Sequence, residues 1–241
     1  MHNLPMDQPT VVRFDPAEPF AADAFAQLAI ELHDAPSVGE TVDAVVQFAL
    51  QAENCTYAGV ALAMRGGRTE IGAVTDPVVE AIYQAQIEAG EGPMITALTE
   101  RTTVYIPDTA AETRWPDWQR RIVGLGIGSV LHVPMAASDR TIGVLSLFNT
   151  RADAFDTDDE AIAHILARHA SIAVASARHE ETMAQAVDAR KLVGQAMGIL
   201  MERFDVDGDR AFAILKRYSQ DTNTKLRDVA QQLVDTRKLP H

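Results

Sequence analysis

The stretch that decides the fold is residues 129–148, SVLHVPMAASDRTIGVLSLF. It contains two apolar runs, Ser129–Val133 and Ile142–Phe148, separated by the turn Ser138-Asp139-Arg140. Short apolar runs bounded by turn residues predict β-strands. We therefore expect two strands of one sheet here.

The chain before this stretch predicts further strands and several helices. Tyr57–Met64 and Thr69–Val74 flank Arg65-Gly66-Gly67-Arg68, a pattern typical of a β-hairpin. Thr103–Ile106 predicts another strand. Helices are expected from about Asp23, from Val38, from Asp76 to about Ala89, near Ile95–Thr99 and around Trp115-Pro116-Asp117-Trp118. This order predicts an α+β domain with one central sheet, in which strands are flanked by helices.

Residues 156–204 predict one long helix. They contain no proline, and their two glycines are Gly194 and Gly198. Apolar residues advance by alternating threes and fours, which is typical of helices that pair in a coiled coil. We expect a homodimer, and the alternative is a single helix packed on its own domain. The expected dimer seam contains Ile162, Ile165, Ile172, Met183 and Val193.

The last part of the chain predicts only helices. Asp207 is expected to cap one helix and Thr224 another. The expected core residues of these helices are Ala211, Phe212, Leu215, Tyr218, Leu226, Val229, Ala230 and Leu233. With the end of the long helix they predict a three-helix bundle, which is marginal as an isolated core because of its size.

Charge is distributed unevenly along the chain. The net charge of −13 argues against nucleic-acid binding by the whole molecule. Residues 182–241, however, hold 10 Lys and Arg against 8 Asp and Glu, so this segment carries +2 and residues 1–181 carry −15. Such asymmetry indicates an interaction segment at the C-terminal end.

The composition limits the class of protein. Apolar residues make up 47% of the chain, which is enough for a packed core. Cys55 is the one cysteine, so an intramolecular disulfide and a thiolate-clustered metal site are excluded. No export signal and no apolar run long enough for a transmembrane helix is present, and we expect a cytoplasmic protein without membrane contact.

Catalytic motifs are absent from the sequence. There is no Gly-x-Ser-x-Gly, no His-Glu-x-x-His and no glycine-rich phosphate loop. His132 lies in a strand pattern, where we expect a core histidine with a hydrogen-bond partner; the alternative is a histidine that faces a pocket. Because no acid–base pair, nucleophile or metal site stands out, we expect a protein that is not an enzyme and holds no metal.

Several motifs resemble a known sensory family. They are Gly90-Glu91-Gly92-Pro93, Thr113-Arg114-Trp115-Pro116, Gly126–Met135 and Thr141–Phe148. Together they make residues 23–180 similar to a GAF domain of the subgroup found fused to ANTAR domains in actinobacteria. The resemblance does not identify a ligand, since GAF domains differ in what they bind and some have no ligand. Candidate pocket residues are Tyr57, Tyr105, Trp115, Trp118 and His132, and core packing explains them equally well.

The C-terminal segment resembles the ANTAR domain, an RNA-binding module. The matching stretches are Val193–Arg203, Ala211-Phe212, Ser219, Asn223–Leu226 and Val229-Ala230. Many ANTAR domains have lysine where this chain has Met197. The domains expected are a tail at 1–20, a GAF core at 21–156, a connecting and dimerisation helix at 157–185, and an ANTAR domain at 186–241.

The double resemblance implies a signal-responsive transcription antiterminator. Such proteins are dimers that bind two RNA hairpins in a leader transcript. RNA loops are recognised through base edges and phosphates, which polar and cationic side chains contact. The candidates are Arg190, Lys191, Gln195, Arg217, Ser219, Gln220, Asn223 and Lys225. The alternative is a dimeric GAF module that acts through protein contact without RNA.

Overall fold

The computed structural model describes residues 19–52, 54–137 and 140–238. The chain forms two compact units, residues 1–178 and residues 179–241, which are treated one at a time below. Residues 1–18 of the expected tail, and Ser138 and Asp139 of the expected turn, lie outside the described residues. The expected domain boundaries after residues 156 and 185 stay predictions.

The first unit is built on a five-stranded antiparallel sheet. Its strands are β1 (Tyr57–Ala63), β2 (Thr69–Val74), β3 (Val104–Ile106), β4 (Ser129–Ala137) and β5 (Arg140–Asn149). They lie in the order β2-β1-β5-β4-β3. The predicted pairing of β1 with β2 and the predicted strands in residues 129–148 are confirmed, and so is the α+β class.

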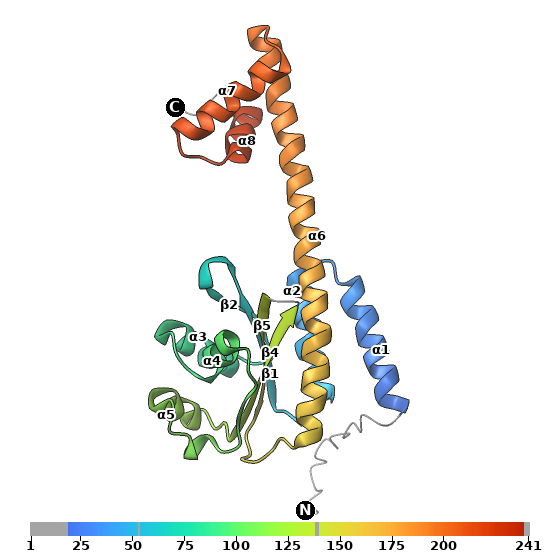
Figure 1. The fold of residues 1–241 in the computed structure, drawn as a ribbon, viewed down its shortest axis with the longest axis vertical. Helices are drawn as coiled ribbons and strands as arrows, with labels where there is room; N and C mark the ends of the chain where they lie inside the picture. Colours follow the sequence, from blue (N-terminus) through green and yellow to red (C-terminus); the bar gives the residue numbers. More distant parts are fainter. Residues whose placement is uncertain (1–18, 53, 138–139, 239–241) are drawn as a thin grey trace, which may run out of the picture. The chain divides into compact units, whose positions relative to one another are not determined.

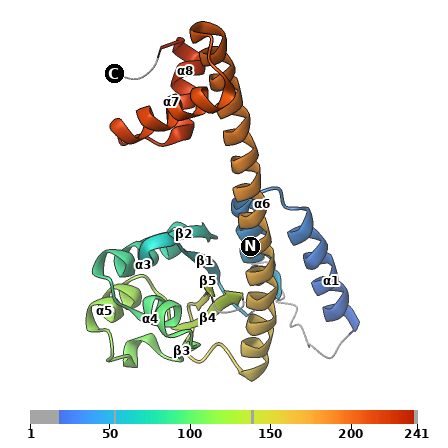
Figure 2. The ribbon, with the colours of Figure 1, turned by 45° about the horizontal axis from the view of Figure 1, so that its top comes forward.

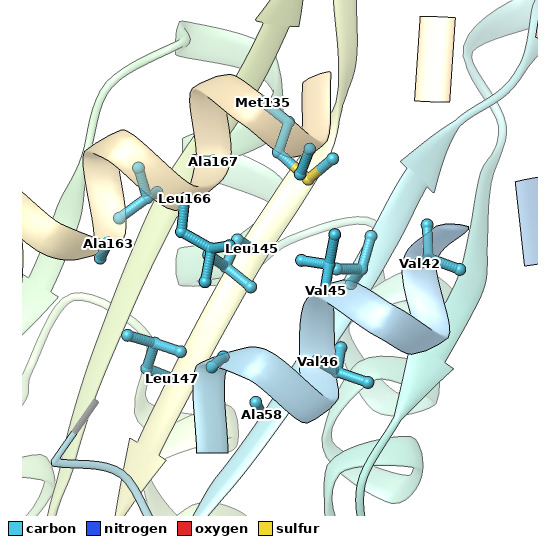
Figure 3. Close-up of a cluster of buried hydrophobic side chains, with 14 of the residues drawn as sticks. Val42, Val45, Val46, Ala58, Met135, Leu145, Leu147, Ala163, Leu166 and Ala167 are labelled. Atoms are coloured by element: carbon cyan, nitrogen blue, oxygen red, sulfur yellow. The ribbon is translucent and has the colours of Figure 1, made fainter. Parts of the chain in front are cut away.

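One face of the sheet packs against α1 (Pro19–Asp34), α2 (Val38–Ala52) and the first part of α6 (Thr157–Phe204) (Figure 1). Apolar residues alternate along the strands, so every second side chain points into this layer. Figure 3 shows how α2, β5 and α6 meet there, with Val45, Leu145 and Leu166 fully buried. Phe25 of α1 packs against this layer, and its ring centroid lies 5.2 Å from that of Phe48.

The opposite face packs against α3 (Pro77–Ala89), α4 (Pro93–Glu100) and α5 (Pro116–Gly124) (Figure 2). Asp76 caps α3, because its carboxylate accepts a hydrogen bond from Val78 N, as predicted. Gly92 starts α4 at φ 132°, where a Cβ atom would also lie 2.3 Å from Gln86 Oε1. Gln86 in turn accepts a hydrogen bond from Met94 N, which fixes the corner between α3 and α4.

The N-terminal end of α6 is capped by carboxylates. Asp156 Oδ1 accepts hydrogen bonds from the backbone of Asp158 and Asp159, and Asp159 Oδ2 accepts one from Asp156 N. This reciprocal pattern is a capping box, and it also places negative charge at the positive end of the helix dipole. The predicted long helix is therefore present, and it runs for 48 residues.

The second unit is a three-helix bundle made by the end of α6, α7 (Gly208–Asp221) and α8 (Leu226–Thr236). Its core is small and apolar, and consists of Ala196, Leu200, Ala211, Leu215, Val229, Ala230 and Leu233. Asp207 caps α7 as predicted, by accepting a hydrogen bond from Arg210 N.

Two sequence predictions for this bundle are wrong. Thr224 does not cap α8, because Lys225 is the N-cap residue and the Thr224 hydroxyl donates to Thr222 O instead. Phe212 is not a core residue, since 42% of it is exposed. The periodicity of α7 places it beside the buried Ala211, one position outside the stripe that Ala211 and Leu215 define.

No helix in the described ranges is long and apolar enough to span a membrane. Within the same ranges, no group of three or more histidine, cysteine, aspartate or glutamate side chains is arranged to hold a metal ion.

Candidate nucleic-acid interface

The part of α6 that belongs to the second unit has one polar face. Arg190, Lys191 and Gln195 are all exposed there, whereas Ala196 and Leu200 on the opposite side are buried. Gly194 and Gly198 lie on the exposed face, and a Cβ atom at either position would meet no described atom within 4 Å. Packing inside the described chain therefore gives no reason for these two glycines, although each one weakens a helix by about 1 kcal/mol relative to alanine.

Met197 lies on the side of α6 that faces the bundle. It is half-buried against the core, and its Cε would be 3.7 Å from a Cβ atom at Gly208. The position at which many ANTAR domains have lysine is thus used for packing in this chain.

Two further candidates lie on α7. Arg217 and Gln220 are exposed, and Arg217 Nε is 3.5 Å from Asp221 Oδ2. An ion pair this exposed contributes little to stability. Asp221 therefore holds the guanidinium of Arg217 only weakly.

The last three candidates are Ser219, near the end of α7, and Asn223 and Lys225, in the turn before α8. Asn223 and Lys225 are exposed, and Asn223 has φ 49°, in the left-handed region. Ser219 Oγ donates to Thr224 O at 2.7 Å, and Thr224 N donates to Ser219 O. Ser219 thus stabilises the turn that presents Asn223 and Lys225, and its hydroxyl hydrogen is already donated within this turn.

The structure therefore groups the eight candidates by element. Asn223 N donates to Gln220 O, so Gln220, Asn223 and Lys225 belong to one compact turn. Arg190, Lys191 and Gln195 share a face of another helix in the same unit.

The five aromatic candidates of the sensory unit lie on two different faces of the sheet. Tyr57, Trp115 and Trp118 pack in the layer under α3–α5. Tyr105 packs on the other face, where its hydroxyl donates to Phe155 O at 2.9 Å and its ring lines a cavity of about 210 Å³. The five residues therefore do not form one pocket.

His132, the fifth candidate, is completely buried under α3–α5. Its Nδ1 lies 2.7 Å from Ser146 Oγ, so the expected hydrogen-bond partner is present. Burial lowers the pKa of His132 to about 3, because the imidazolium would lose its hydration, and the ring is neutral at pH 7. Sequence reasoning missed Ser146 and Tyr83, although a serine in the middle of an apolar strand was a usable signal.

The five expected seam residues have different surroundings. Ile165, Ile172 and Met183 are 41%, 61% and 57% exposed. Ile162 is buried in the first unit and Val193 packs on the core of the second. Three of the five side chains are therefore available to a partner helix.

Comparison with protein-family models identifies the class of this protein. The GAF domain family model matches residues 35–175, more than half of the chain, so the chain belongs to the GAF family. The ANTAR domain model matches residues 181–234. Both are regulatory domains, and this chain is a regulator that joins a GAF sensor domain to an ANTAR domain. No curated protein is significantly similar to the chain.

Solved structures show the same fold for the first unit. A domain assigned to a two-component sensor histidine kinase of Sinorhizobium meliloti 1021 is 21% identical, with a TM-score of 0.53 over 62% of this chain and 98% of that one. The GAF domain of an Acinetobacter phosphoenolpyruvate-protein phosphotransferase is 15% identical, with a TM-score of 0.52 over 67% and 96%. The free methionine-R-sulfoxide reductase of Neisseria meningitidis, in complex with its substrate, is 17% identical, with a TM-score of 0.53 over 71% and 99%.

Proposed function

We propose that this protein is a signal-responsive transcription antiterminator. Its ANTAR domain binds paired hairpin loops in leader transcripts, and its GAF domain controls that binding. The observation that supports the proposal best is the compact turn of the second unit, where an amide and a cation are both exposed, two residues apart, at Asn223 and Lys225. An amide pairs with a base edge and an ammonium with a phosphate, so this pair has the chemistry that an RNA loop requires.

The polar face of α6 supports the same function. Gly194 and Gly198 leave that face flat between Arg190, Lys191 and Gln195. A flat helix face beside cations allows a sugar–phosphate backbone to approach closely, because no side chain holds it away. This gives a reason for two helix-weakening glycines that intramolecular packing does not give.

A homodimer is part of the proposal. The exposed Ile165, Ile172 and Met183 are apolar positions of α6 that a second copy of the helix would cover. Two linked ANTAR domains engage two hairpins with an increased effective concentration, so pairing strengthens binding without new contacts to RNA.

A non-catalytic role is also part of the proposal. The fold is similar to that of a free methionine-R-sulfoxide reductase, but a likeness at 17% identity concerns the fold alone. This chain has Cys55 alone, which is half-buried with Sγ 3.6 Å from Ala49 O. A sulfenic acid formed there would have no second thiol in the chain to resolve it.

A mobility-shift titration tests the RNA function. It compares an RNA with two hairpins, an RNA with one hairpin and a scrambled RNA, each at a fixed salt concentration. We expect the tightest binding for two hairpins and the weakest for the scrambled control. Equal affinity for all three would remove specific recognition from the proposal.

The second candidate function is a dimeric GAF module that acts through protein contact. It is favoured by large apolar side chains exposed in the second unit, namely Met201, Phe204 and Phe212. Exposed apolar residues of this size often mark protein-binding surfaces. Normal regulation by a variant that has lost both Asn223 and Lys225 would support this candidate.

A further inference from the structure

Polar side chains form a row inside the apolar layer between the sheet and α3–α5. Ser146 of β5 lies directly opposite Gly59 of β1 and His132 of β4 in the strand register. Residues directly opposite each other on neighbouring strands point to the same face of the sheet, so the three positions share this layer. Ser146 and His132 are both fully buried, and Nδ1 of the imidazole is 2.7 Å from the serine Oγ.

Tyr83 of α3 reaches the same row from above the sheet. A Cβ atom at Gly59 would lie 2.9 Å from Tyr83 Oη and 2.8 Å from Val79 Cγ1, so the glycine makes room for the phenol. Burial raises the pKa of Tyr83, and the nearby Ser146 lowers it to a smaller extent. The tyrosine hydroxyl is thus close to Ser146, although the pair does not reach the geometry of a normal hydrogen bond.

Two hydrogen-bonding atoms of this row have no partner. Within the described ranges, neither His132 Nε2 nor Tyr83 Oη makes a hydrogen bond, and both are buried. A third such atom, Trp118 Nε1, belongs to the same layer. Buried polar groups are nearly always paired in native proteins, because desolvation without a hydrogen bond is unfavourable. Three unpaired buried groups in one layer indicate that another molecule supplies their missing hydrogen bonds.

We propose that Tyr83, Ser146 and His132 form the recognition site for the signal, and that it takes a small uncharged molecule with an amide or azole edge. This inference rests on the proposed function, since it specifies the signal to which the GAF domain responds. An amide or azole edge offers a donor next to an acceptor. It can therefore pair with the tyrosine hydroxyl and with Nε2 in either neutral tautomer of the imidazole.

The charge of the ligand follows from the surroundings. The layer is otherwise apolar, with Ile82, Met94 and Phe148 fully buried in it. Asp159, at the start of α6 on the other face, is the one Asp, Glu, Lys or Arg among the buried residues of the described chain. Among the described residues, no buried Lys or Arg is present to pair with a phosphate or carboxylate under α3–α5. Burial of an unpaired charge is strongly unfavourable.

Matched pairs of probes test this inference on the full chain. They are acetamide against acetate, and nicotinamide against nicotinate, which differ in charge but hardly in shape. The readouts are the ¹⁵N shift of His132 Nε2, assigned with His132→Gln, and the melting temperature. We expect both amides to shift the nitrogen signal with millimolar dissociation constants, and both carboxylates to bind at least about tenfold more weakly.

Two variants separate recognition from folding. Tyr83→Phe removes the unpaired hydroxyl, so we expect an unchanged or higher melting temperature in the free protein and about tenfold weaker amide binding. Ser171→Ala is the matched control, because this buried serine lies on α6 and donates to Ala167 O at 2.6 Å. It should leave amide binding unchanged.

Three results would overturn the inference. They are no shift of the His132 signal by either amide at about 10 mM, equal binding of amides and carboxylates, or a lower melting temperature of Tyr83→Phe with unchanged amide binding. An RNA mobility shift on the same preparation keeps the two proposals apart. Amide-selective binding without specific RNA binding would contradict the antiterminator and support the ligand site. Specific RNA binding without amide-selective binding would support the antiterminator and contradict the ligand site.

Discussion

At the scale of single residues, the backbone of Asn223 decides how its role can be tested. Its φ of 49° is accessible to asparagine and glycine but strained for alanine. Asn223→Gly therefore removes the amide and keeps the turn. We expect RNA affinity to fall by about fivefold to 150-fold, because a lost base-edge contact costs about 1–3 kcal/mol, while the melting temperature stays nearly the same. Competition with RNAs altered in the loop measures the accompanying loss of sequence preference.

Lys225 should behave differently from Asn223. Its ammonium is suited to a phosphate, so Lys225→Ala should weaken specific and scrambled RNA alike. The slope of log affinity against log salt should then fall by about 1. A matched control is Lys238→Ala, which removes an exposed lysine beyond α8. An unchanged salt slope for Lys225→Ala would contradict the phosphate contact.

His132 links the buried row to the pH dependence of stability. Its pKa of about 3 in the folded protein lies below the ordinary value of 6.5, so the unfolded chain binds the proton more tightly. The first unit should therefore lose stability as the pH falls from about 6.5 towards 3. Between pH 7 and pH 5 this residue should account for about 2 kcal/mol.

Urea unfolding of His132→Phe against the unaltered protein at both pH values measures this contribution. Other groups titrate equally in both proteins, so the difference isolates the imidazole. The same dependence on pH in both proteins would show that His132 is protonated without cost in the folded state.

At the scale of elements, α6 provides a test of the flat polar face. Gly194→Ala and Gly198→Ala meet no described atom, so each should stabilise the second unit by up to about 1 kcal/mol. RNA binding should nevertheless weaken, because the added methyl groups hold the backbone of the RNA away. Gly39→Ala, at an exposed helical glycine of α2, is the control that should leave RNA binding unchanged. Unaltered affinity in both α6 variants would exclude close approach at this face.

The elements also show what could be predicted from the sequence. The strands of residues 57–74 and 129–148 and the long α6 were predicted because their apolar periods are strong and local. The cap of α8 was not, since Thr224 forms its hydrogen bond within the turn and leaves Lys225 at the N-cap. The row of Tyr83, Ser146 and His132 was missed because it depends on the register between strands that are distant in sequence. Tyr105 was grouped with the other aromatic candidates because the alternation of side chains in a short strand does not tell which face of the sheet each side chain occupies.

At the scale of the whole molecule, the proposed antiterminator needs two copies of the chain. Ile172 of α6 is 61% exposed and belongs to the expected seam, where a second copy of the helix would cover it. Ile172→Lys should therefore shift the protein from dimer to monomer in sedimentation equilibrium. Ile30→Lys is the matched control, because Ile30 of α1 is 56% exposed and lies outside the expected seam. It should leave the oligomeric state unchanged.

The monomeric variant should also separate affinity from pairing. Its binding to a single hairpin should stay the same, since the turn at Asn223 and Lys225 is untouched. Its preference for two hairpins over one should disappear, because that preference comes from the effective concentration of the second ANTAR domain, a gain on the order of 10² or more. If Ile172→Lys remains dimeric, the seam lies elsewhere. If it is monomeric and still prefers two hairpins, then a single chain engages both loops and the homodimer is not the basis of recognition.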